Sequence, residues 1–165
     1  MEGSTERLRR AGVSDGAIDA LRWCRNAVLL TLRRRALENP VIGTSAALRD
    51  YLHVDMSSSS RERFRTLYLN ARNELLREEE TAVGTVDTVP FYPREIIGRA
   101  IELGSTSLII VHNHPSGDPR PSRRDVDATL SLQTLCGGLG ITLLDHLIVG
   151  RGEIHSLRAS GRLGL

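Results

Sequence analysis

Residues 107–129 read SLIIVHNHPSGDPRPSRRDVDAT, and the order of residue types in this stretch decides the fold. It opens with an apolar run typical of a buried strand, and the run ends at His112 and His114. A loop rich in proline and glycine follows, in which glycine permits unusual dihedrals and proline stiffens the remainder. Asp125 then stands near the start of a predicted helix over 122–135. The stretch therefore predicts a strand, a rigid loop and a helix that present two imidazoles and a carboxylate.

Beyond this stretch, strands and helices alternate along the C-terminal part of the chain. Apolar residues occupy both parities of 141–150, so both faces of that strand are expected to be covered. Strands interleaved with helices predict an α/β (α+β) fold with a mixed sheet. Hydrophobic periodicity and turn residues predict strands over 63–70, 75–89, 106–111, 141–150 and 152–157, and helices over 93–104 and 122–135.

The N-terminal part of the chain is predicted to be helical. Its apolar periodicity indicates a long helix over 15–39, and Thr44 or Ser45 is placed to cap a second, short helix. A run of four serines follows and marks a joint between two parts of the chain. The predicted organisation is a helical N-terminal segment over 1–57 and an α/β domain over 58–165.

Composition indicates an ordinary globular protein and excludes some chemistry. The 165 residues are 40% hydrophobic and 25% charged, and the net charge of +2 is too small to indicate nucleic-acid binding by itself. All 22 basic residues are arginine, so no lysine is available as a nucleophile or a phosphate-binding cation. The sequence shows neither a membrane-spanning run nor a signal peptide, and Cys24 and Cys136 have no paired-cysteine motif. We therefore expect a reduced, cytoplasmic protein.

His112 and His114 can face one point in space, because residues i and i+2 of a strand point the same way. With Asp125 they provide two imidazoles and one carboxylate, a ligand set of catalytic zinc sites that leaves a fourth position open. An alternative stays open from the residues alone. Ser122 and Asp125 also match a capping box, in which the carboxylate binds the Ser122 backbone. The two interpretations compete for one side chain.

The segment HNHPSGDPRPSRRD resembles the JAMM signature of the JAB/MPN metalloprotease superfamily: His-x-His-Pro, six residues, Ser, two residues, Asp. The flanking segments GTVDTVPFYPREIIGRAIELGSTSLIIV and LLDHLIVGRGEIHSL resemble the bacterial RadC family more closely. This similarity covers about residues 40–165. It implies a zinc ion held by His112, His114 and Asp125 in a JAB/MPN domain of cytidine-deaminase-like architecture, with the N-terminal helices as a short appendage.

The resemblance assigns two further residues. The RadC pattern carries Glu-x-Phe at the start of the first strand, which matches Glu62-Arg63-Phe64 and implies that Glu62 is the general base. Ser122 occupies the position of the superfamily serine, which is implied to donate a hydrogen bond to the developing oxyanion. Without the resemblance, Glu62 would be interpreted as a solvated surface charge.

Asp145 and His146 form the other polar pair in an apolar strand. Buried polar groups need partners. One of the two could orient a zinc-binding imidazole, or both could bond the backbone across the sheet. The sequence leaves these alternatives open, and neither residue is placed in the catalytic set.

Together these features favour a zinc metallopeptidase or isopeptidase that acts on a peptide or protein substrate. The alternative is a DNA-repair-associated accessory protein with a structural or vestigial metal site. DNA binding has weak support, because the glycine turn of a helix-hairpin-helix, usual in longer RadC proteins, does not occur in this sequence. A third hypothesis, an HNH nuclease, fits poorly because such enzymes distribute these residues over a ββα finger.

Overall fold

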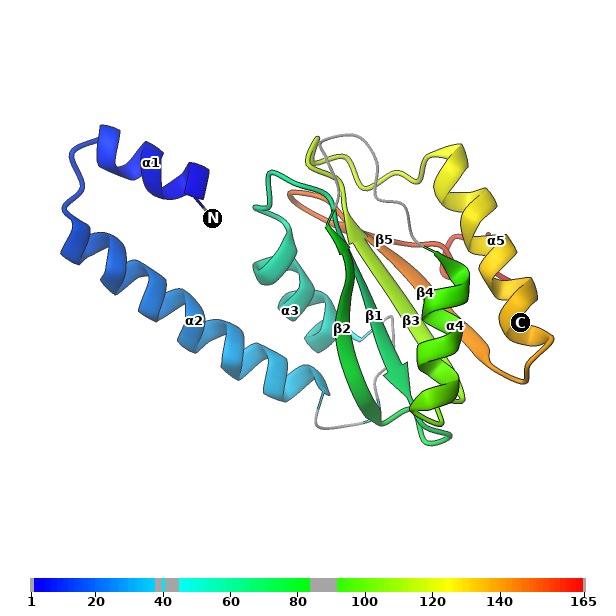
Figure 1. Ribbon diagram of the computed structural model, residues 1–165. Coiled ribbons are helices and arrows are strands. Elements are labelled where there is room, and N and C mark those ends of the chain that lie inside the picture. The colour runs from blue at the N-terminus through cyan, green and yellow to red at the C-terminus, as the bar shows by residue number, and fades with distance from the viewer. Residues whose placement is uncertain (1, 38–39, 41–44, 84–91, 165) are drawn as a thin grey trace.

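The structure is a computed structural model that describes residues 2–37, 40, 45–83 and 92–164. The strands of this part of the chain form one mixed sheet in the order β2-β1-β3-β4-β5, with helices on both faces (Figure 1). The predicted mixed α/β fold with preceding helices is confirmed. Its elements are α1 (Glu2–Arg10), α2 (Asp15–Leu37), α3 (Ala46–Met56), β1 (Arg63–Leu69), β2 (Leu75–Val83), α4 (Pro93–Glu102), β3 (Ser107–Asn113), α5 (Arg123–Gly137), β4 (Thr142–Val149) and β5 (Ile154–Ser156).

β3 is the central strand of the sheet. It pairs antiparallel with β1 and parallel with β4, and all seven of its residues are buried. Parallel neighbours need a crossover connection, which α5 provides. The strand begins one residue later and ends two residues later than the predicted 106–111. It continues because His112 still pairs with Phe64 of β1 and with Ile148 of β4.

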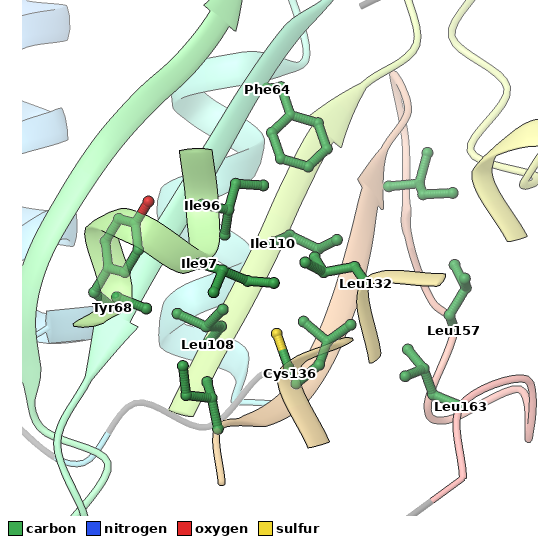
Figure 2. Close-up of a cluster of buried hydrophobic side chains, with 14 residues drawn as sticks. Phe64, Tyr68, Ile96, Ile97, Leu108, Ile110, Leu132, Cys136, Leu157 and Leu163 are labelled. Carbon is green, nitrogen blue, oxygen red and sulfur yellow. The ribbon is translucent and has the colours of Figure 1, made fainter. Parts of the chain in front are cut away.

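One face of the sheet is covered by α4 and α5. Figure 2 shows the hydrophobic cluster between these helices and the sheet. Leu108 and Ile110 of β3 point into this cluster. Alternate residues of a strand share a face, so His112 points to the same side. The other labelled members are Phe64 and Tyr68 of β1, Ile96 and Ile97 of α4, Leu132 and Cys136 of α5, and Leu157 and Leu163 near the C-terminus.

The opposite face of the sheet is covered by α3, with the C-terminal half of α2 beside it (Figure 1). Leu48 and Leu52 of α3 are fully buried in one cluster with Ile109 and Val111 of β3. The predicted cap is confirmed at Ser45, whose hydroxyl oxygen accepts a hydrogen bond from the Leu48 backbone N–H at 3.2 Å. Thr44, the other predicted cap, lies outside the described residues.

A buried ion-pair network also joins α3 to the sheet. Arg65 of β1 contacts Asp55 of α3 at 2.5 Å and Glu78 of β2 at 2.7 Å. The Tyr51 hydroxyl of α3 donates to the same Glu78 carboxylate at 2.7 Å. Buried charged side chains need partners of opposite charge, and these residues supply them to one another. The α3 helix of the N-terminal segment therefore packs against the sheet. The domain boundary predicted at residue 57 stays a prediction.

Two predicted elements run into residues that the structure does not describe. The helix expected over 15–39 is observed as Asp15–Leu37, and the strand expected over 75–89 as Leu75–Val83. The remaining residues of both predictions lie outside the described part of the chain.

Two predictions from composition can be compared with the structure. None of the helices in the described ranges is long and apolar enough to cross a bilayer. Cys24 is exposed, Cys136 is buried, and both are free thiols. Burial raises the pKa of the Cys136 thiol to about 11, so Cys136 is a core residue and not a reactive nucleophile at neutral pH.

Replacing Leu48 with alanine should test whether α3 belongs to the core. Leu48 is fully buried, so the substitution leaves a cavity and should lower the free energy of unfolding by about 2–5 kcal/mol. Leu21→Ala on α2 is the control, because that side chain is 55% exposed and its loss should change the free energy by about 0.5 kcal/mol. Chemical denaturation measures both. Equal losses in the two variants would contradict the packing described for α3.

Candidate metal centre

The two histidines of the quoted stretch lie at the end of the central strand. His112 is the penultimate residue of β3, and the backbone N–H of His114 donates to the Val149 carbonyl at 3.0 Å, which extends the pairing with β4. The ring centroids of the two histidines are 4.8 Å apart, and their Nε2 atoms are 2.9 Å apart. Both imidazoles therefore face one point, as strand parity predicts.

The loop after β3 holds the His114 ring. Its Gly117 has φ +90°, and a Cβ there would lie 2.7 Å from Cγ of Arg151, so a side chain would not fit. The Gly117 carbonyl accepts from the Arg151 backbone N–H at 3.0 Å, which fixes the loop. The Asp118 carbonyl lies 2.7 Å from Nδ1 of His114. Because a carbonyl oxygen only accepts, Nδ1 carries the proton, and Nε2 presents a lone pair to the site.

Asp125 caps α5, and its carboxylate also faces the two imidazoles. Its Oδ2 accepts hydrogen bonds from the Ser122 backbone N–H at 2.7 Å and from the Ser122 hydroxyl at 2.6 Å. The first of these bonds and the bond from the Asp125 N–H to Ser122 Oγ, at 3.2 Å, form the capping box of α5. The same carboxylate faces the imidazoles, with Oδ1 3.4 Å from Nε2 of His112 and Oδ2 3.5 Å from Nε2 of His114. The cap occupies Oδ2, so Oδ1 is the oxygen left to bind an ion.

Glu62 lies just before β1 and reaches the same cluster. Its Oε1 is 3.9 Å from Nε2 of His112, and its side chain is only 12% exposed. Asn113 holds the backbone on both sides of it: Oδ1 accepts from the Arg63 N–H at 2.9 Å, and Nδ2 donates to the Arg61 carbonyl at 3.1 Å. A glutamate that looked like a surface charge therefore lies close to the imidazoles, on a backbone segment that Asn113 holds in place.

The distances between these side chains fit a small divalent ion. Glu62, His112 and His114 each offer one ligand atom, and these atoms all lie within 4.8 Å of one another. Two atoms that each bind one zinc ion at about 2.1 Å can be at most about 4.2 Å apart. The nearest ligand atoms of His112, His114 and Asp125 lie pairwise within this limit, at 2.9, 3.4 and 3.5 Å. The wider 4.8 Å bound belongs to the set that includes Glu62, which lies 3.9 Å from His112. The cluster could therefore hold a metal ion without large rearrangement.

The electrostatics of the metal-free cluster suit ligand chemistry. Burial lowers the pKa of His112 to about 4, although the Asp125 carboxylate opposes this shift. The hydrogen bond with Asp125 raises the pKa of His114, against the effect of burial. Burial alone would raise the pKa of Asp125, but its bonds with His114 and Ser122 and the nearby His112 hold that pKa well below its usual range. At neutral pH His112 is thus neutral and Asp125 ionised, the forms that bind metals.

Comparison with known proteins agrees with this geometry. The sequence model of the RadC-like JAB domain matches residues 42–162, which is most of the chain. This chain belongs to the RadC family. A UPF0758 protein of Ruegeria pomeroyi is 45% identical over 159 residues, which are 96% of this RadC-family chain and 71% of that relative. A UPF0758 protein of Rhodobacter capsulatus is 44% identical over 152 residues, or 92% and 71% of the two chains. The predicted family membership is confirmed.

Asp145 and His146 of β4 take different roles: one contacts an imidazole of the site, and the other bonds the backbone. His146 Nε2 lies 2.8 Å from Nδ1 of His112, so this residue contacts a candidate ligand. Asp145 instead bonds the backbone and β5. Its Oδ1 accepts from the N–H groups of His146 and Arg158, and its Oδ2 accepts from the Ser156 hydroxyl at 2.7 Å. Asp145 is therefore a structural residue in this RadC-family fold.

Two residues of the site were not predicted. Asn113 carried a signal, because alternation along a strand turns it away from its two histidine neighbours and a buried amide needs partners. Thr129 carried no such signal in the sequence. It stands one helical turn after Asp125, where threonines are common in many helices, and only the structure shows that its hydroxyl meets His146.

The hydrogen bonds of Asn113 lead to a test. Asn113→Ala would leave the Arg63 N–H and the Arg61 carbonyl without the amide, and should lower the free energy of unfolding by about 1–3 kcal/mol. Asn26→Ala on the exposed side of α2 is the matched control and should change it by about 0.5 kcal/mol at most. Urea denaturation of both variants checks this, and the assignment fails if the two losses are equal.

Proposed function

We propose that this protein is a zinc-dependent peptidase or isopeptidase that hydrolyses an amide bond in a peptide or protein substrate. The observation that supports this most is the position of Glu62, an acid held 3.9 Å from an imidazole nitrogen in a largely buried cluster. His112, His114 and Asp125 would hold the metal. Two imidazoles, one carboxylate and an open fourth position make a catalytic zinc set.

Each residue has a role that follows from its geometry. Bound zinc supplies a Lewis acid that lowers the pKa of water to about 7. Glu62 would accept the proton of the attacking water and deliver it to the leaving amine, and this transfer requires a carboxylate within hydrogen-bonding reach of that water. The imidazoles would bind the ion through Nε2, which the Asp118 carbonyl leaves unprotonated in His114.

Ser122 has two roles in this proposal. It holds Asp125 through the capping box, and its hydroxyl proton points to Oδ2 of that carboxylate. To donate to an oxyanion, as the superfamily pattern implies, the hydroxyl proton has to turn away from Oδ2 by rotation about the Cβ–Oγ bond. The oxyanion role remains a proposal.

The DNA-associated alternative also remains a proposal, without a specific structural observation in its favour. Three consecutive arginines, Arg33, Arg34 and Arg35, lie near the end of α2, and such a cluster could contact phosphate. Arg33 instead pairs with Glu78 of β2 at 2.9 Å.

Zinc content and peptide cleavage test the proposed activity together. Wild type and Glu62→Gln should each bind about one equivalent of zinc, whereas His112→Ala should bind less than about half. New amino termini in a proteome-derived peptide library, identified by mass spectrometry, should appear with wild type and fall by about 10²-fold or more with Glu62→Gln. Glu153→Gln, in the exposed turn before β5, is the control and should cleave normally. A zinc-free wild type, or an active Glu62→Gln, would refute the proposal.

Zinc affinity should fall as the pH falls, because protons compete for the imidazole nitrogens. The pKa of His114 in the metal-free protein is raised above the ordinary 6.5, so competition there should begin above that pH and weaken binding by about tenfold per pH unit. His112, with a pKa of about 4, should add a second proton only near that pH. Equilibrium dialysis between about pH 8 and 4 measures this, and a flat profile would show that the histidines are not ligands.

A further inference from the structure

A series of three hydrogen bonds, two buried and one partly buried, runs from His112 back to the helix that carries Asp125. Nδ1 of His112 lies 2.8 Å from Nε2 of His146, and Nδ1 of His146 lies 2.6 Å from Oγ1 of Thr129. The Thr129 hydroxyl in turn contacts the backbone carbonyl of Asp125. The series links β3, β4 and α5, and the side chains of His112, His146 and Thr129 are nearly or fully buried.

The last acceptor in this series decides the direction of every hydrogen bond in it. A carbonyl oxygen only accepts, so the Thr129 hydroxyl must give its single proton to Asp125. Toward His146 the Thr129 oxygen can then only accept, which places the His146 proton on Nδ1. A neutral imidazole has one N–H, so Nε2 of His146 is an acceptor and Nδ1 of His112 must be the donor. The lone pair of His112 is therefore on Nε2.

We propose that His146 and Thr129 are positioning residues that hold the His112 ring with its Nε2 lone pair facing Asp125, His114 and Glu62. The inference extends the proposed function, because it concerns the ligand that the metal would need. It explains why a threonine and a second histidine are buried beside His112.

The hydrogen bonds of His112 and His114 leave the Nε2 atom of each ring without a proton. His114 is held by the Asp118 carbonyl, so its Nε2 is also unprotonated. Two lone pairs then face each other across 2.9 Å, and they cannot hydrogen-bond to each other without a cation or a proton between them. Separate carbonyl groups, those of Asp118 and Asp125, thus set the two rings in the form that binds metal.

Phe64 protects this hydrogen-bonded pair. Its ring stacks on His112 at 6.2 Å between centroids with an interplanar angle of 12°, and meets His146 edge-on at 6.1 Å. An apolar ring at this position covers the His112–His146 bond and keeps water from offering alternative partners. This gives a physical reason for the phenylalanine of the Glu-x-Phe pattern.

Substitutions at Thr129 separate positioning from simple packing. Thr129→Val keeps the shape but removes the hydroxyl, so the His146 ring loses the acceptor that sets its tautomer. We expect zinc affinity, measured by competition with a chromogenic chelator, to fall about 10–100-fold. Thr129→Ser restores the hydroxyl and should stay within about threefold of wild type. Thr134→Val is the matched control: its hydroxyl also bonds a carbonyl four residues earlier on α5, but it is exposed and should leave zinc affinity unchanged.

A spectroscopic measurement tests the inference without any metal. Long-range ¹H–¹⁵N correlation spectra of the metal-free wild-type protein at about pH 8 report which imidazole nitrogen carries the proton. We expect His112 and His146 protonated on Nδ1, and a mixture of tautomers at His112 in Thr129→Val. A His112 proton on Nε2 in wild type, or Thr129→Val binding zinc as tightly as wild type, would overturn the inference. A wild type that binds no zinc would refute the proposed function, while the tautomers would still decide the inference.

Discussion

The position of β3 between β1 and β4 is the constraint on which both the core and the candidate metal centre depend. Leu108 and Ile110 point from this strand into the cluster under α4 and α5, and His112 follows them on the same face. A central strand has its backbone groups paired on both sides, so it is among the stiffest parts of a fold. Its neighbours bring Phe64 and His146 to the same ring. The site is thus an extension of the core.

Asp125 joins the start of α5 to this centre through three different groups. One carboxylate oxygen caps the helix, the other faces His112, and the backbone carbonyl accepts from Thr129. A change in the first turn of α5 would therefore alter one candidate ligand, Asp125, and the hydrogen bonds of another, His112, together. In known metal sites, residues outside the ligand set orient the ligands in the same way, through hydrogen bonds.

Sequence reasoning succeeded where a pattern is local. The alternation of strands and helices follows from hydrophobic periodicity, and the facing of His112 and His114 follows from strand parity. It could not decide between cap and ligand at Asp125, because a carboxylate has two oxygens and only coordinates show where each one lies. Glu62 is far from the histidines in the chain and was assigned through family resemblance, since an isolated glutamate has no spacing that marks it.

By itself the sequence determined the mixed α/β fold, the presence of a buried strand that leads into the two imidazoles, and the types of side chain available as ligands. These properties depend on neighbouring residues and on the repeat of a strand or a helix. Only the tertiary structure decided that Glu62 and His146 lie beside His112, and which nitrogen of the His112 ring carries no proton. The order of strands and the direction of hydrogen bonds arise between segments distant in the chain, where no local pattern records them.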